Sequence, residues 1–258
     1  MMSRSATTDV TEDRFLDGRL VMRQPRDGYR AAMDSVLLAA AVPARAGQTV
    51  LELGCGAGVA SLCLGWRVPG LGLHGVELQP GYAALARANS ALNGISLQVT
   101  EADLTDLPAA LRQRQFDQVM ANPPYYRAGA GTAARLAGRE TALREATPLA
   151  VWIDTAMRRL VSGGRLTLIQ QAARLPDVLA ALDGRAGDVA VMPVQPRIGR
   201  DATRVILNAR KGARGPFRLH APLILHAGTR HDGDGEDLTA LARAVLRDGA
   251  PLPATADG

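Results

Sequence analysis

Thr49-Val50-Leu51-Glu52-Leu53 runs directly into Gly54-Cys55-Gly56-Ala57-Gly58, and this stretch decides the fold. The first part is a short apolar run whose length and flanking residues are typical of a central strand. The glycines form a turn, and residues 59 to about 65 then have a helical pattern. A helix that starts after a Gly-rich turn presents unpaired backbone N–H groups to a ligand. The spacing is G-x-G-x-G rather than the dinucleotide-binding G-x-G-x-x-G, so a plain tight turn is the alternative.

Short apolar runs alternate with helical stretches downstream of the glycines. The runs have the length of strands, and one helical stretch stops at the turn signal Asn93-Gly94. This alternation predicts an α/β fold with a doubly wound parallel sheet. The predicted strands are residues 71–78, 96–100, 116–121, 165–170, 189–194 and 203–209, and the predicted helices are residues 80–92, 148–161, 175–182 and 237–247.

The N-terminal region has a different pattern. Residues 1–13 are polar, which predicts a disordered tail. Asp17-Gly18 lies between apolar residues and predicts a small β-hairpin over residues 15–22. Residues 31–42 are apolar and form an expected helix that Pro43 ends. Because there is no repeat and no convincing linker, we expect a single domain over residues 14–250.

Composition sets broad limits on function. The chain has 258 residues, 47% of them hydrophobic and 21% charged, so it can bury a full core. Its net charge of +5 favours an anionic partner, nucleic acid first. Cys55 and Cys63 lack metal-ligand spacing, so we expect reduced buried thiols and no metal site. The N-terminus lacks a signal-peptide pattern and no apolar run is long enough to span a membrane, so we expect a cytoplasmic protein.

Two acidic residues lie at the ends of the next two predicted strands. Glu77 can accept hydrogen bonds from both hydroxyls of a ribose, and a solvated strand-end carboxylate is the alternative. Asp103 is placed to read an adenine amino group, and a helix N-cap is the alternative. Together with the glycine turn, the two acids indicate a nucleotide-like ligand at one edge of the sheet.

Asn122-Pro123-Pro124-Tyr125 follows the predicted strand at residues 116–121. Two prolines directly after a strand stop the sheet and force a stiff extended turn. The Asn122 side-chain oxygen and the Pro123 carbonyl then form a rigid pair of acceptors that can grip an NH2 group. Tyr125 can stack on the flat ring that carries this group, which is worth about 1–3 kcal/mol per base. A rigid turn with a packed tyrosine is the structural alternative.

The order of these motifs resembles the class I S-adenosylmethionine-dependent methyltransferases that modify exocyclic or amide nitrogens. The resemblance implies a Rossmann-like fold: a mostly parallel seven-stranded sheet with an antiparallel late strand, flanked by helices. It also implies catalysis by Asn122, Pro123 and Tyr125. The residues that it assigns to the cofactor S-adenosylmethionine are Gly54, Gly56 and Gly58 (methionine and ribose side), Glu77 (ribose), Asp103 (adenine), Glu52 (amino acid end) and Asn122.

A second, narrower resemblance covers most of residues 15–250. Its N-terminal part is Gln24-Pro25, Gly28-Tyr29-Arg30 and Asp34-Ser35-Val36-Leu37-Leu38-Ala39. The match continues through Asn122-Pro123-Pro124-Tyr125, Arg139-Glu140, Gly163-Gly164-Arg165-Leu166, Pro193-Val194-Gln195-Pro196-Arg197, Ala202-Thr203-Arg204-Val205 and Lys211-Gly212.

These segments resemble the bacterial tRNA1(Val) adenine-N6 methyltransferase family, which methylates an adenosine in the anticodon loop of a valine tRNA. The resemblance implies that Asp34 and Ser35 close the methionine pocket. A polar cap on a buried helix is the alternative for this pair.

Arginines cluster in the stretch after Tyr125 and in the late part of the chain. Their density predicts a phosphate-contacting surface beside the pocket, and a solvated face is the alternative. The expected nucleic-acid-binding residues are Arg127, Arg139, Arg197, Arg200, Arg204 and Lys211.

The sequence therefore predicts methyl transfer to the N6 amine of an adenosine in tRNA, with tRNA as the partner. Amide and adenine NH2 groups are chemically alike, so two alternatives stay open: a glutamine N5-methyltransferase of release factors and an rRNA guanine-N2 methyltransferase. A non-catalytic RNA-binding module on the same fold is a third, although the glycine motif and the asparagine that catalysis needs are both intact.

Overall fold

The first βαβ units form one half of a sheet in the computed structural model, which describes residues 9–124, 147–228 and 237–253. The strands of this half pair in parallel, as the alternating pattern predicts. Helix α3 starts at a proline and stops at Gly94, whose φ is 63°. The strands are β3 (Thr49–Leu53), β4 (Gly72–Glu77), β5 (Leu97–Glu101) and β6 (Phe116–Ala121), and the helices between them are α2 (Val59–Arg67), α3 (Pro80–Asn93) and the unpredicted short α4 (Ala109–Gln113).

The second half continues the sheet and then reverses direction. Strand β7 pairs in parallel with β6, and β9 runs antiparallel to both β7 and β8. Two short strands, β10 and β11, pair in parallel with β8. The elements are α6 (Leu149–Arg159), β7 (Leu160–Gln171), the 3-10 turn η2 (Ala172–Arg174), α7 (Leu175–Leu182), β8 (Ala186–Arg197), β9 (Arg204–Lys211), β10 (Arg218–Leu219), β11 (Leu223–His226) and α8 (Ala240–Leu246).

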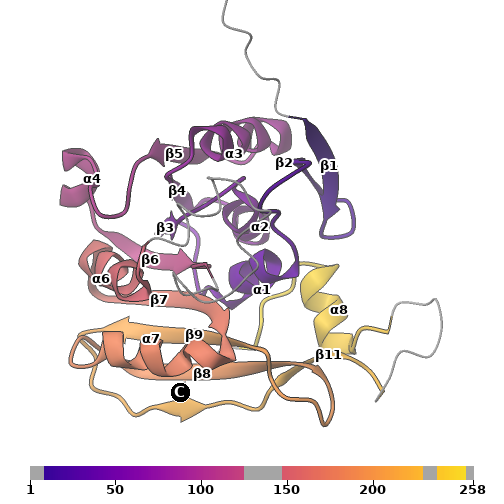
Figure 1. Cartoon of the computed structure of the whole chain (residues 1–258), viewed down its shortest axis with the longest axis vertical. Coiled ribbons are helices and arrows are strands. Elements are labelled where there is room, and N and C mark those ends of the chain that lie inside the picture. Colours follow the sequence, from indigo (N-terminus) through magenta and orange to yellow (C-terminus); the bar gives the residue numbers. More distant parts are fainter. Residues whose placement is uncertain (1–8, 125–146, 229–236, 254–258) are drawn as a thin grey trace, which may run out of the picture.

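The strand order is β10-β8-β9-β7-β6-β3-β4-β5, and β11 also pairs with β8 (Figure 1). The predicted fold class is confirmed: the sheet is mostly parallel, with β9 as the antiparallel late strand. The path from β8 to β5 contains the expected seven strands, and β10 and β11 extend the sheet beyond them. These two strands are too short to show an alternating pattern, so the sequence did not predict them.

The strand order reverses direction between β3 and β6. The chain moves from β3 outward to β4 and β5, and then returns to form β6 on the other side of β3. In an open α/β sheet, ligands bind outside the carboxyl ends of the strands at such a switch point. The glycine turn after β3 and the Asn-Pro-Pro turn after β6 border this point.

Helices cover both faces of the sheet. One apolar cluster joins the sheet to α2, α3, α8 and α1 (Met33–Ala41), and a second joins it to α4, α6 and α7. Every residue of α1 from Ser35 to Ala41 is buried. Arg67 satisfies the end of this helix by donating to the carbonyls of Ala39 and Val42 at 2.8 and 2.6 Å. That residues 14–250 form a single domain stays a prediction.

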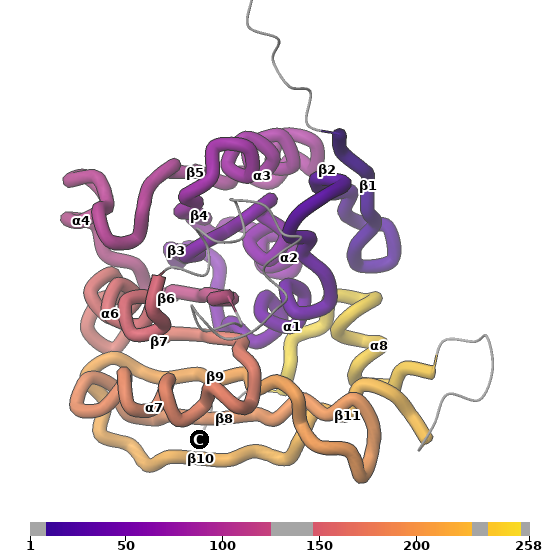
Figure 2. Tube along the Cα trace, in the orientation of Figure 1, coloured from indigo at the N-terminus to yellow at the C-terminus, as the bar shows by residue number. Residues whose placement is uncertain are grey.

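An N-terminal hairpin packs beside α3, as Figures 1 and 2 both show. Its strands are β1 (Val10–Phe15) and β2 (Leu20–Pro25), joined by a turn in which Asp17 and Gly18 have positive φ. The predicted hairpin is therefore confirmed, but the predicted tail to residue 13 is too long. Residues 10–13 pair with β2, and their exposure alternates along this edge strand. Their polar composition alone does not reveal the strand.

The predicted helix at residues 148–161 and the predicted strand at residues 165–170 are not separated by a turn at Gly163-Gly164. Strand β7 already begins at Leu160, and its pairing with β6 shifts register between Leu160 and Arg165. Gly163 has a φ of 75°, and a Cβ at Gly164 would lie 2.9 Å from the carbonyl oxygen of Asp117. The glycines thus form a bulge within the strand, where the neighbouring backbone approaches closely.

Candidate active site

The turn after β3 has a backbone conformation that glycine adopts readily and other residues do not. Gly54, Gly56 and Gly58 have φ values of 64°, 55° and 84°. A Cβ at Gly54 would lie 2.5 Å from Cη2 of Trp152 on α6. The glycines therefore allow both the chain path and the close packing of α6. The turn leads directly into the N-terminus of α2, whose first turn carries backbone N–H groups that lack partners within the helix.

Glu52 is buried near the end of β3, with an exposed fraction of 4%. Its Oε2 accepts hydrogen bonds from the backbone N–H and the hydroxyl of Ser61, at 3.0 and 2.5 Å. The carboxylate therefore lies at the first turn of α2, where the helix dipole favours a negative charge. Burial and then the charge of Glu52 raise the pKa of the Cys63 thiol. Cys55 and Cys63 are both buried and unbridged, which agrees with the expected reduced thiols.

Glu77 is buried at the end of β4 and contacts the glycine turn. Its Oε2 accepts the backbone N–H of Gly56 at 2.8 Å, and its Oε1 accepts the backbone N–H of Gln79 at 3.0 Å. These two contacts orient the carboxylate, and a carboxylate oxygen can accept more than one hydrogen bond. The solvated-carboxylate alternative is wrong, since only 2% of the residue is exposed. Its role towards a ribose stays a prediction.

Asp103 lies in the loop after β5. Its Oδ1 accepts hydrogen bonds from the backbone N–H and the hydroxyl of Thr105, at 2.7 and 2.8 Å. This contact closes a local Asx turn rather than capping one of the described helices. The turn holds the carboxylate beyond the end of β5, two strands away from the switch point, and its role towards an adenine is a prediction.

The Asn-Pro-Pro turn begins where β6 ends at Ala121. The Asn122 amide nitrogen donates to the Tyr29 hydroxyl at 3.3 Å. The Pro123 carbonyl accepts a hydrogen bond from Gln170 Nε2, also at 3.3 Å. Asn122 is half-buried and Pro123 is buried. Tyr125, the expected stacking residue, lies outside the described residues.

Tyr29 and Gln170 are site residues that the sequence reasoning missed. Tyr29 belongs to the Gly28-Tyr29-Arg30 segment before α1, where a resemblance was noted without a role. Gln170 is fully buried near the end of β7, the strand after β6 in the sheet. The rule that polar side chains at the carboxyl ends of parallel strands face the ligand site would have found Gln170. No comparable pattern marks Tyr29.

Asp34 and Arg204 form an ion pair that the sequence analysis did not anticipate. Arg204 Nε lies 2.8 Å from the Asp34 carboxylate, and the residues are 170 positions apart. Asp34 is the second residue of α1 and Arg204 the first residue of β9. Arg204, expected to contact nucleic acid, therefore pairs with the residue expected to close the methionine pocket. Ser35 is buried beside Asp34, and a role for either residue towards the cofactor stays a prediction.

The described residues of the predicted basic surface do not all lie beside the pocket. Arg200 is exposed in the turn between β8 and β9, at the same edge of the sheet as Asn122. Arg197 pairs with Asp237 and donates to the Ala227 carbonyl at 2.5 Å. Lys211 does not belong beside the pocket, because β9 runs antiparallel and ends at the opposite edge, where Lys211 donates to the Leu160 carbonyl at 2.7 Å. Arg127 and Arg139 lie outside the described residues.

These residues fit S-adenosylmethionine. The glycine turn lets a ligand approach the backbone, and the buried Glu77 carboxylate next to it provides acceptors for hydroxyl groups. In the part of the chain that the structure describes, no group of three or more His, Cys, Asp or Glu residues could hold a metal. None of the described helices is long and apolar enough to cross a membrane.

The sheet, its switch point and the groups at the strand ends define a class I S-adenosylmethionine-dependent methyltransferase. Within this class, the chain belongs to the family described as "Methyltransferase small domain", whose model matches residues 30–192. S-adenosylmethionine is the cofactor of this family.

Relatives and solved structures agree with this placement. The chain is 30% identical to the tRNA1(Val) (adenine(37)-N6)-methyltransferase of Dickeya chrysanthemi, over 86% of this chain and 88% of that protein. It is 33% identical to the protein of the same name from Porphyromonas gingivalis, over 64% and 68%. An Agrobacterium tumefaciens crystal structure described as "a predicted O-methyltransferase" matches with a TM-score of 0.68 and 28% identity, over 86% of this chain and 98% of that one.

Proposed function

We propose that this protein transfers the methyl group of S-adenosylmethionine to the exocyclic N6 amine of an adenosine in tRNA. The observation that carries the proposal is the position of Asn122-Pro123-Pro124 at the end of β6, across the switch point from the glycine turn. The names of the relatives from Dickeya chrysanthemi and Porphyromonas gingivalis support tRNA as the substrate and the adenine N6 as the target.

The acceptors of the turn suit a nitrogen target better than an oxygen target. An NH2 group has two N–H bonds to donate, and the Asn122 Oδ1 and the Pro123 carbonyl provide two acceptors. A hydroxyl has only one such bond, so it can contact only one of the two acceptors and is less firmly oriented. The pair of acceptors therefore favours N-methylation, whereas the solved relative from Agrobacterium tumefaciens is described as an O-methyltransferase.

The proposed roles of the chain's own groups follow from their chemistry. Asn122 and Pro123 orient the two N–H bonds and draw the nitrogen towards sp3 geometry, which localises its lone pair and aims it. Glu77 and the glycine turn hold the cofactor at the neighbouring strand ends. When bound, S-adenosylmethionine supplies the methyl group as an electrophile on a sulfonium sulfur. No general base is required before transfer, because the nitrogen loses its proton readily once it carries the methyl group.

An adenosine in a tRNA loop is accessible to such a site. Loop bases can be splayed out and stacked without the cost of opening a duplex. The chain's net charge of +5 and the exposed Arg200 at the edge of the sheet that carries Asn122 are compatible with a polyanionic substrate.

The test is methyl transfer in vitro with labelled S-adenosylmethionine, followed by mass spectrometry of the nucleosides. We expect N6-methyladenosine in tRNA, confined to one loop fragment. Parallel reactions contain rRNA or a peptide-chain release factor. Label in guanine of rRNA or in a release-factor glutamine would replace the proposed substrate by one of the open alternatives. Saturable cofactor binding without label in any of these substrates would contradict the proposal altogether.

A further inference from the structure

We propose that Tyr29 is a positioning residue that orients the Asn122 side-chain amide for catalysis. The inference rests on the proposed function for its activity test, although its structural part can be tested without any substrate. It makes the segment before α1 part of the active site rather than an N-terminal extension of the fold.

The contact joins distant parts of the chain. The Asn122 Nδ2 donates to the Tyr29 Oη at 3.3 Å, and the two residues are 93 positions apart. Tyr29 comes from the loop between β2 and α1, whereas Asn122 follows β6. An element outside the parallel sheet therefore reaches the residue that the proposed reaction depends on most.

The Asn122 side-chain amide needs a contact that fixes its orientation if its oxygen, and not its NH2 group, is to face the target. Its oxygen and its NH2 group have nearly the same size, so a half-turn of the amide plane exchanges acceptor for donor with little steric cost. The NH2 end would face the N–H bonds of the target with a like partial charge. In the structure the Tyr29 hydroxyl oxygen accepts from Nδ2, which leaves Oδ1 as the end of the amide that can accept from the target. The same hydroxyl could donate to Oδ1 after a half-turn, so its role in the proposal is to hold the amide plane in the orientation that the structure shows.

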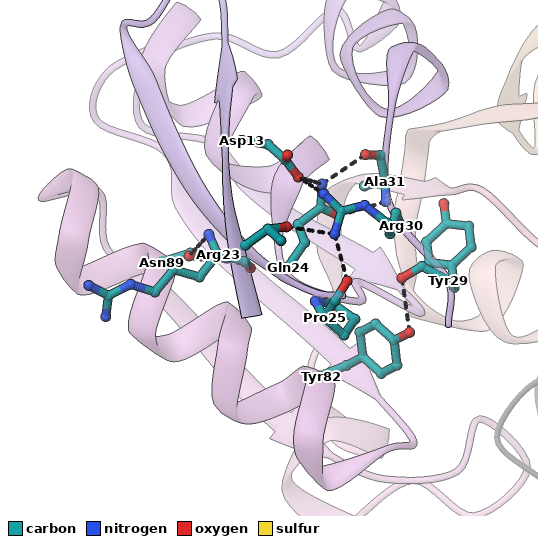
Figure 3. A network of polar contacts seen from close by, with 10 residues as sticks. Asp13, Arg23, Gln24, Pro25, Tyr29, Arg30, Ala31, Tyr82 and Asn89 are labelled. Atoms are coloured by element: carbon teal, nitrogen blue, oxygen red, sulfur yellow. Dashed lines mark hydrogen bonds and ion pairs between the residues drawn. The ribbon is translucent and has the colours of Figure 1, made fainter. Parts of the chain in front are cut away.

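Tyr29 is itself held in place by a network of polar contacts, which Figure 3 shows. The Tyr82 hydroxyl on α3 donates to the Tyr29 carbonyl at 2.9 Å. On the other side of Tyr29, Arg30 contacts the Asp13 carboxylate at 2.5 Å and the Pro25 carbonyl at 2.6 Å. The segment that carries Tyr29 is therefore fixed to both the hairpin and α3.

Gln24, on strand β2 of the hairpin, adds further contacts to this network, which together form the frame around Tyr29. It is 2% exposed, and its amide pairs with the backbone of Ala31, accepting the N–H at 2.7 Å and donating to the carbonyl at 3.0 Å. Gln24 Nε2 also donates to Asp13 at 2.7 Å. The frame fixes the backbone on both sides of Tyr29, and the contact with Asn122 sets the position of its hydroxyl, although 41% of the residue is exposed.

The decisive experiment is NMR spectroscopy of protein labelled with nitrogen-15 asparagine. The chain has only the asparagines Asn89, Asn93, Asn122 and Asn208, and Asn122→Asp assigns the side-chain amide of interest. In Tyr29→Phe we expect the Asn122 amide resonances to shift and to exchange faster with water, while those of the other asparagines stay in place. Tyr82→Phe is the comparison variant, because it removes the hydrogen bond to the Tyr29 carbonyl but keeps the Tyr29 Oη, so we expect a smaller shift of the Asn122 resonances than in Tyr29→Phe.

The activity test separates positioning from folding. For Tyr29→Phe we expect a reduction in kcat of about 3- to 10-fold, the size of one lost hydrogen bond between neutral groups, with an unchanged Kd for S-adenosylmethionine. In the Asn122→Asp background the same change should have almost no effect, because a carboxylate presents an acceptor in either orientation. A double-mutant cycle over the two sites measures this coupling.

Two outcomes would overturn the inference. Unmoved Asn122 resonances in Tyr29→Phe would show that the hydroxyl does not hold the amide, whatever the substrate proves to be. Equal losses of kcat from Tyr29→Phe in the wild-type and Asn122→Asp backgrounds would show that Tyr29 acts by another route. If wild-type protein methylates no tRNA, the proposed function fails, but the NMR result still decides the role of Tyr29.

Discussion

The cofactor side of the site and the catalytic turn are held together in different ways. Around the glycine turn, polar groups find partners nearby in sequence: Glu52 and Ser61 are 9 positions apart, and Gly56 and Glu77 are 21 apart. The Asp34–Arg204 pair, 170 positions apart, is the exception on the cofactor side. At the catalytic turn, the partners are remote. Asn122 contacts a residue 93 positions before it, and Pro123 contacts one 47 positions after it.

The two sides therefore depend on different parts of the fold. A single βαβ unit contains most of what orients the glycine turn and Glu77. The acceptors of the catalytic turn instead require the N-terminal segment and β7 to be docked against β6. We therefore expect substitutions on the cofactor side to change cofactor affinity, and substitutions around the turn to change kcat with cofactor affinity preserved.

The largest effect is expected from Asn122→Ala. Removing one of two preorganised groups at the reacting atom should lower kcat by about 100- to 1,000-fold. Cofactor affinity should change far less than kcat, although the resemblance also assigns Asn122 to the cofactor, because the described contacts of the glycine turn do not involve Asn122. Single-turnover methyl transfer and calorimetric titration with S-adenosylmethionine measure the two quantities. Full transfer by this variant would refute the catalytic role of the turn.

Gly54→Ala should destabilise the fold at the glycine turn and weaken cofactor binding. The new methyl group would lie 2.5 Å from Trp152, at a φ of 64°, so overpacking and backbone strain add. We expect a loss of about 2–4 kcal/mol in the free energy of unfolding, with weakened cofactor binding. Gly81→Ala is the control, because nothing lies within 4 Å of its Cβ position in α3 and the change should be neutral or stabilising. Chemical denaturation compares the two, and equal stabilities would contradict the packing argument.

Glu77→Gln tests whether the buried carboxylate contributes to cofactor affinity rather than to kcat. An amide nitrogen cannot accept the N–H of Gly56 or Gln79, so one of these hydrogen bonds is lost together with the charge. We expect cofactor affinity to fall by about 10- to 100-fold, the worth of a charge-assisted hydrogen bond, while kcat at saturating cofactor changes little. Glu101→Gln is the control, since Glu101 is exposed and pairs in register with Glu77 on β5. A fall in kcat at saturating cofactor would place Glu77 on the catalytic side instead.

Gln170→Leu tests the second remote contact. Leucine fills the space but cannot donate to the Pro123 carbonyl, so this acceptor becomes less well oriented. We expect kcat to fall by about 3- to 10-fold with cofactor affinity unchanged. Gln118→Leu is the control, because Gln118 is a buried glutamine near the amino end of β6, away from the site. If both variants lowered kcat equally, a general loss of packing would explain the result.

The smallest effect is expected from Arg200→Ala. If Arg200 neutralises one phosphate, the logarithmic salt dependence of tRNA affinity should become shallower by about 0.7 to 0.9. Cofactor binding and single-turnover chemistry should not change. Arg45→Ala is the control, as Arg45 is equally exposed but precedes β3 and lies at the opposite edge of the sheet. An identical salt dependence for both variants and the wild type would exclude Arg200 from the tRNA surface.

The sequence by itself was sufficient for the fold class and for the order of the motifs. Short apolar runs, glycines with required positive φ and strand-end acids are local features, and each follows from a few adjacent residues. Because parallel strands bring their carboxyl ends to one edge, a correct strand assignment also placed Glu77 and Asn122 at that edge. The bulge at Gly163-Gly164 and the strands β10 and β11 were missed, since very short or interrupted strands carry no readable period.

Only the tertiary structure decided which side chains hold the acceptors of the catalytic turn and which cations remain exposed. Tyr29, Gln170 and the Asp34–Arg204 pair combine residues that no local pattern relates. Lys211 looked equivalent to Arg200 in sequence, yet the reversal of β9 carries it to the opposite edge of the sheet. The physical reason is that hydrophobic periodicity and turn residues are local signals, each spread over a few residues. Contacts across the sheet instead depend on how whole helices and strands pack against one another.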